Sequence, residues 1–118
     1  MTHVKNAKIG RMNTFLRHSR KEYFRYKKTG KLIHLEQAGE KVYNAYILLL
    51  EVIHGVNITS HKAVRDYTRL SNNRTVVELG TAADALHIRF YEGGDEFFME
   101  RNLFKAWSLF AKLKRRIK

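Results

Sequence analysis

Basic side chains gather at the two ends of this 118-residue chain. Residues 1–30 carry nine Lys or Arg against the single acid Glu22, residues 31–110 carry nine basic and ten acidic side chains, and residues 111–118 carry five basic ones. The net charge of +12 therefore resides at the ends, which indicates a polyanionic partner whose phosphates Lys and Arg can bind. The candidate nucleic-acid-binding residues are Lys5, Lys8, Arg11, Arg17, Arg20, Lys21, Arg25, Lys112, Lys114, Arg115 and Arg116.

Three aromatic side chains lie among the basic residues of the first segment. Tyr23, Phe24 and Tyr26 interleave with Arg and Lys, a mixture that suits stacking on bases while the cations contact phosphates. The same rings can instead pack in a hydrophobic core. We expect Tyr23 and Tyr26 to pack inward, whereas the pattern does not assign Phe24 to either side.

Metal binding and catalysis find little support in the residue spacing. The chain lacks cysteine, which excludes disulfides, thiolate zinc sites and cysteine nucleophiles. Glu51 and His54 form one Glu-x-x-His pair, whereas a helical two-metal site needs a second copy on a facing helix. We interpret His87 as a partly buried, hydrogen-bonded residue rather than a general base. The sequence therefore predicts no metal, no cofactor and no catalytic residue.

The element that must organise these residues is the stretch 34–56. Its four successive aliphatic residues at 47–50 make it apolar all round there, so other elements must cover every side. The stretch is too short and too often interrupted by polar residues to span a bilayer. Its apolar and small residues recur at alternating steps of three and four, as on one face of an α-helix: Leu35, Ala38, Val42, Ala45, Leu49, Val52 and Val56.

Four further helices are predicted around the central one. The first covers residues 12–28 and follows a basic arm at 1–10, and Gly30 ends it. A short helix at 61–70 begins after a Thr59 or Ser60 cap, with inward residues Ala63, Val64, Tyr67 and Leu70. A helix at 75–91 is thin where Gly80 and alanines allow close approach, and a last helix follows the Asp95 cap and carries Met99, Leu103, Ala106, Phe110, Leu113 and Ile117 on one face. The predicted fold is all-α: one domain, 1–118, forming an up-and-down bundle of four main helices plus one short helix.

The predicted topology brings the two basic ends together. If the long helices alternate in direction, the first begins where the last ends, and their clusters form one patch. The apolar residues at 46–53 and the aromatic residues Phe97, Phe98, Phe104 and Trp107 exceed what a small core needs, so we also expect a homodimer. The first residues lack the apolar core of a signal peptide, which predicts a cytoplasmic protein without a membrane partner.

Residues 31–94 resemble a known family of helical proteins. The shared pattern is Ala38-x-Glu40-Lys41 followed by an aromatic residue and Ala45, then Ser60-His61 at the start of a helix, then Leu86-His87 with Phe90-Tyr91-Glu92. In this pattern the chain resembles the archaeal PaREP-type proteins, which are related to the HEPN superfamily. The resemblance implies an up-and-down bundle, often dimeric, in a group that contains ribonuclease toxins as well as members without known activity.

The active ribonucleases of that superfamily carry an Arg and a His on one late helix, with four to six residues between them. Neither His61 nor His87 has an Arg at that spacing, and the pair that meets it, Arg11 and His18, lies outside the matched region. We therefore favour a small basic protein that binds DNA or RNA through phosphate contacts without catalysis. Two alternatives stay open: a HEPN-like ribonuclease or toxin–antitoxin component, and a dimeric interaction module.

Overall fold

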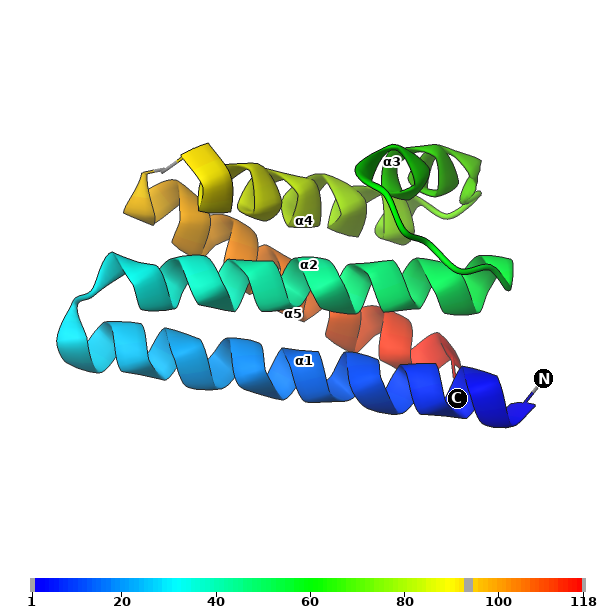
Figure 1. The fold of residues 1–118 in the computed structure, drawn as a ribbon, viewed down its shortest axis with the longest axis horizontal. Helices are drawn as coiled ribbons and strands as arrows, with labels where there is room; N and C mark the ends of the chain where they lie inside the picture. The colour runs from blue at the N-terminus through cyan, green and yellow to red at the C-terminus, as the bar shows by residue number, and fades with distance from the viewer. Residues whose placement is uncertain (1, 93–94, 118) are drawn as a thin grey trace.

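The chain forms a bundle of helices (Figure 1). A computed structural model describes residues 2–92 and 95–117, with side chains at 3–88 and 95–115. Within these ranges the all-α prediction is confirmed, because they contain five helices and no strand. The helices are α1 (Thr2–Thr29), α2 (Leu32–His54), α3 (His61–Leu70), α4 (Arg74–Glu92) and α5 (Glu96–Ile117).

The centre of the bundle is α2, which packs against each of the other four helices. Leu35, Val42 and Leu49 are buried on the predicted face, and Leu48 and Leu50 are buried beside them. A helix that is apolar on all sides must be surrounded, and α1, α3, α4 and α5 supply that cover. None of the described helices combines the length and apolar character that a membrane span requires.

The long helices alternate in direction, as the sequence predicts. Figure 1 shows α1 beginning at the end of the bundle where α5 finishes, with α2 and α4 running between the two ends. The short α3, which follows α2 and precedes α4 in the chain, lies over the same end of the bundle. The beginning of α1 and the end of α5 therefore lie at one end of the molecule, although they are far apart in sequence.

The N-terminal segment differs from the prediction, because the expected arm at 1–10 is helical from Thr2 onward. The reason is a long-range contact of Lys8 with the end of α2. Its ammonium lies 3.3 Å from a carboxylate oxygen of Glu51 and 3.0 Å from the side-chain oxygen of Asn57. Ile9 also packs partly buried against the core, so the segment is fixed by tertiary contacts and continues α1.

Caps and breaks mostly agree with the predicted turn signals. Ser60 caps α3 by accepting the Ala63 amide, and Asn73 and Asp95 accept amides at the starts of α4 and α5. Leu70 was expected to point inward, but its side chain is 68% exposed, because α3 ends at that residue. Ile117, predicted on the inward face of the last helix, lies outside the described side chains.

Close approach between α2, α3 and α4 depends on Gly80. A Cβ atom at this position would collide with the Tyr46 hydroxyl and would lie 2.8 Å from the Thr68 methyl group. That hydroxyl cannot easily move, because it lies 2.8 Å from the Thr68 hydroxyl and donates to the Val76 carbonyl at 3.1 Å. Glycine is therefore required here by packing rather than by backbone conformation.

We predict that Gly80→Ala destabilises the fold by about 1–3 kcal/mol, because the added methyl group overpacks a rigid hydrogen-bonded contact. Gly10→Ala is the matched control, since Gly10 lies in α1 with nothing near the site of its missing Cβ. At Gly10, the higher helix propensity of alanine should instead stabilise the folded protein by up to about 1 kcal/mol. Chemical denaturation followed by circular dichroism measures both changes, and a stabilised Gly80→Ala protein would contradict this packing.

Candidate nucleic-acid interface

A continuous basic stripe follows the outer face of α1. Arg17, Lys21, Phe24 and Lys28 are all exposed. Their positions i, i+4, i+7 and i+11 place them on one side of the helix over about 16 Å. A stripe of this length can follow several phosphates of a nucleic-acid strand.

The one acidic residue of α1 is turned away from this stripe. The Glu22 carboxylate accepts a hydrogen bond from His34 of α2 at 2.9 Å and pairs with Arg25, and its side chain is 15% exposed. Although partial burial acts in the opposite direction, the His34 hydrogen bond and the Arg25 charge lower the pKa of Glu22. The negative charge of α1 is thus held against α2, and the solvent face of α1 carries no acid.

A second basic stripe follows the outer face of α5. Arg101, Lys105, Lys112 and Arg115 are exposed and recur at helical spacing. Lys112 and Arg115 were predicted from the sequence, whereas Arg101 and Lys105 were not. Arg101, Lys105 and Lys112 follow one another at steps of four and seven residues, and this helical spacing could have identified Arg101 and Lys105 from the sequence.

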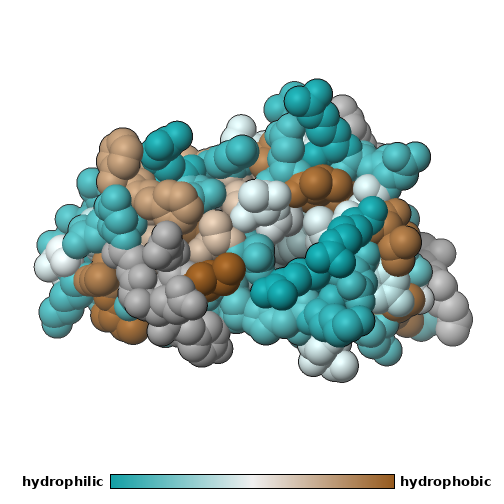
Figure 2. Space-filling model, turned by 90° about the horizontal axis from the view of Figure 1, so that it is seen from above, coloured by the Kyte–Doolittle hydropathy of each residue, from teal (hydrophilic) through white to brown (hydrophobic). Residues whose placement is uncertain are grey.

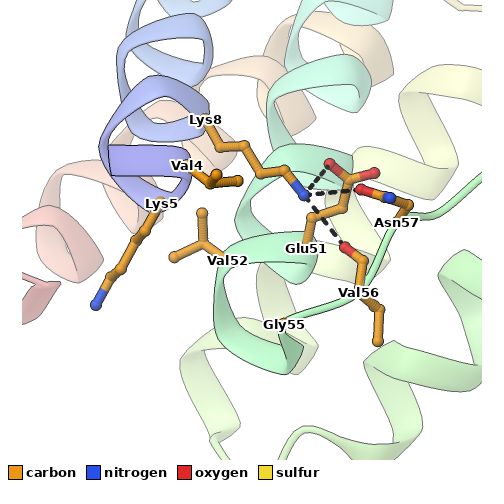
Figure 3. A pocket seen from close by; sticks show the side chains of 8 residues that line it. All are labelled: Val4, Lys5, Lys8, Glu51, Val52, Gly55, Val56 and Asn57. Carbon is orange, nitrogen blue, oxygen red and sulfur yellow. Dashed lines mark hydrogen bonds and ion pairs between the residues drawn. The ribbon is translucent and has the colours of Figure 1, made fainter. Parts of the chain in front are cut away.

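Lys8 is the predicted site residue that the structure removes from the interface. Figure 3 shows its side chain pointing across to Glu51, Asn57 and the Val56 carbonyl, whereas Lys5 points away from them. The ammonium is already neutralised by Glu51, so it has little charge to offer a phosphate. Lys5 keeps an exposed side chain.

The other predicted site residues differ in their surroundings. Arg11 is exposed, Arg20 lies over the Trp107 ring at 5.9 Å, and Arg25 is paired with Glu22. Lys114 is half-buried on α5, and the side chain of Arg116 lies outside the described residues. The structure therefore brings Arg17, Lys21, Lys112 and Arg115 to outer faces of α1 and α5.

The contact between α1 and α5 engages two more acids, Glu96 and Glu100, in hydrogen bonds. The Tyr23 hydroxyl donates to Glu100 at 2.6 Å, and the Tyr26 hydroxyl donates to Glu96. Burial and the Glu100 hydrogen bond raise the pKa of Tyr23 to about 12. The Glu96 hydrogen bond and burial raise that of Tyr26 to about 12. Both tyrosines pack inward as predicted and remain donors at neutral pH, so they hold these carboxylates against α1.

A second polar cluster, which the sequence analysis did not identify, lies where α2, α3 and α4 meet. The Tyr43 hydroxyl is 2.8 Å from Nδ1 of His61, and its ring stacks on His87 at 4.1 Å between centroids. Nδ1 of His87 donates to Glu40 at 3.0 Å, and the rings of His61 and His87 are 4.0 Å apart. His87 is buried and hydrogen-bonded, as predicted. These contacts join residues from three helices.

Burial, followed by nearby charges, shifts the pKa of His61 and of Tyr43. Burial and the nearby His87 lower the pKa of His61, against the opposing influence of Asp84 and Glu40. Burial, followed by the charges of Asp84 and Glu40, raises the pKa of Tyr43. The fold therefore favours the neutral form of His61.

Glu51 and His54, which form the Glu-x-x-His pair, make structural contacts. Glu51 accepts the Ile58 amide at 2.8 Å in addition to pairing with Lys8, and His54 lies 2.8 Å from the Ser71 hydroxyl. Among the residues that the structure describes, no three His, Cys, Asp or Glu side chains are grouped to hold a metal ion. Arg11 and His18, the pair with ribonuclease spacing, are both exposed on α1 about 10 Å apart along its axis.

Comparison with known proteins identifies no relative, since no family model, curated protein sequence or solved structure matches the chain. The resemblance of residues 31–94 to the PaREP-type and HEPN proteins therefore stays a prediction.

The lowered pKa of His61 makes stability depend on pH. The unfolded chain binds a proton at His61 near its ordinary pKa, about 6.5, whereas the folded chain resists that proton. Stability should therefore be complete above about pH 7 and fall as the pH drops below about 6.5, where the unfolded chain takes up this proton. Thermal denaturation across this range should be flatter for His61→Gln. His18→Gln, at an exposed histidine of α1, should keep the steeper wild-type profile, and equal profiles for all three proteins would contradict the assignment.

Proposed function

We propose that the protein binds nucleic acid through phosphate contacts made by the outer faces of α1 and α5, without a catalytic step. The observation that carries this proposal is the acid-free outer face of α1: Glu22 is held against α2, while Arg17, Lys21 and Lys28 face solvent. Exposed cations in a row, without compensating acids, concentrate positive potential at one surface.

The chemistry of the two stripes favours contact with the backbone over recognition of sequence. Arg and Lys dominate the outer faces of α1 and α5, and they bind phosphates of any sequence. Screening in physiological salt limits unpaired surface charges to a range of about 8 Å, so the cations of one stripe act together only on a partner in contact with them. A nucleic-acid strand is such a partner.

The dimeric interaction module is the less favoured alternative. Two copies meeting through these faces would bring like charges together, and each chain carries a net charge of +12. A polyanion instead neutralises that charge and releases its own counterions.

The salt dependence of binding tests the proposal. Replacing Arg17, Lys21 and Lys28 together by Ala should weaken binding and flatten the slope of log affinity against log salt by about 2–3, since each lost phosphate contact removes about 0.7–0.9. Fluorescence anisotropy with a labelled oligonucleotide at several salt concentrations measures this slope. The loss should be similar for unrelated sequences.

A matched control removes the same charge elsewhere. Lys62 and Arg69 pair with Asp66, and Arg74 pairs with Glu78, all on α3 or α4. Replacing these three by Ala should leave the slope within about 1 of the wild type. If both triple variants lose the same slope, net charge alone controls binding and the α1 face is not an interface.

A further inference from the structure

Exposed phenylalanines are concentrated on the two basic helices. Phe24 of α1 is 64% exposed, and Phe97 and Phe104 of α5 are 66% and 46% exposed. They are the exposed phenylalanines among the described side chains. Seen from above the bundle, hydrophobic residues gather toward the end at which α4 connects to α5 (Figure 2). Exposed aromatic rings on a basic surface indicate a binding partner that has an apolar face.

The three rings belong to one side of the α1–α5 pair. Arg20 lies over Trp107 of α5 at 5.9 Å, and Phe24 follows Arg20 by four residues, so both occupy the side of α1 next to α5. On α5, Phe104 meets the ring of Tyr23 edge-on at 5.2 Å, and Phe97 precedes it by two helical turns on the same face. We call Phe24, Phe97 and Phe104 the aromatic side of this pair.

Cations accompany the rings, and two nearby acids of α5 are hydrogen-bonded to tyrosines of α1. The Arg101 guanidinium lies 5.8 Å from the centre of the Phe97 ring and is exposed. Glu96 and Glu100, which flank these positions on α5, are bound by Tyr26 and Tyr23. The aromatic side thus offers apolar ring faces and positive charge together.

We propose that the aromatic side of the α1–α5 pair binds single-stranded nucleic acid, with bases stacked on Phe24, Phe97 and Phe104 and phosphates held by the neighbouring Arg and Lys. This inference rests on the proposed function and specifies the class of nucleic acid. Ring faces combined with a basic track are the general means by which proteins hold single strands without reading sequence.

The geometry favours a single strand over a duplex or a second copy of this chain. Phe97 and Phe104 are about 10 Å apart along α5, a distance that a few nucleotides of an extended strand can span. In a duplex the base faces are stacked on one another and cannot meet a surface ring. A second copy of this chain could bury the three rings, but it would also bring its own Arg20 and Arg101 close to those of the first copy, and these like charges would repel.

Fluorescence anisotropy with a single-stranded oligonucleotide and with its duplex, each titrated at the same series of salt concentrations, tests this inference. The wild type should bind the single strand more tightly than the duplex. Changing Phe24, Phe97 and Phe104 together to Leu keeps apolar bulk but removes the ring faces, and it should weaken single-strand binding at least about tenfold while the salt slope is unchanged. The matched Tyr triple variant, which keeps the rings, should bind within about threefold of the wild type.

A spectroscopic readout accompanies the titration. Trp107 is the single tryptophan of the chain and touches both Tyr23 and Phe104. Its fluorescence should change on adding the single strand to the wild type and the Tyr variant, and much less for the Leu variant.

The outcomes separate the two proposals. If the Leu variant binds single strands as the wild type does, stacking is wrong, although the phosphate interface stands. If neither strand form binds the wild type, the proposed function fails as well. Should sedimentation instead show a wild-type dimer that the Leu variant loses, the aromatic side is a protein interface and the stacking proposal is overturned.

Discussion

The burial of α2 is the constraint on which the rest of the structure depends. Leu48, Leu49 and Leu50 point in three different directions from one turn and are all buried, so no face of the helix there can remain in water. The other four helices must therefore pack around it, and an alternating path is the short way to bring them there. The same packing places α1 and α5 side by side, with their outer faces directed away from α2.

The arrangement of acids follows from that packing and gives the surface its character. Acids next to α1 find partners in the interior: His34 binds Glu22, Lys8 binds Glu51, and Tyr23 binds Glu100. Burying a carboxylate is tolerated when hydrogen bonds or an ion pair compensate its lost hydration. The cations opposite these acids keep their solvent exposure. The outer face of α1 thereby carries exposed cations and no acid.

Periodicity predicted the elements and their inward faces but not their partners. The central helix, predicted at 34–56, lies at Leu32–His54, because its apolar repeat and Gly55 define it locally. The interaction partners of Lys8 could not be predicted, since they lie more than 40 residues away in the sequence and meet Lys8 only when α1 packs on α2. The same applies to the cluster of Tyr43, His61 and His87, which three helices assemble. From the sequence, Phe97 and Phe104 were assigned to a dimer contact, and only the fold showed that both rings are exposed and that Phe104 meets Tyr23 of α1.

The central claim is that one surface, made by α1 and α5, receives a nucleic-acid strand. Amide NMR of the ¹⁵N-labelled protein, titrated with a single strand of about 12 nucleotides, tests it most directly because every helix reports separately. The account predicts shifts that concentrate on the outer residues of α1 from Arg17 to Lys28 and on α5 from Phe97 to Arg115, with α3 unaffected. Shifts centred on α3 and the His61–His87 cluster, or none at saturating oligonucleotide, would contradict it.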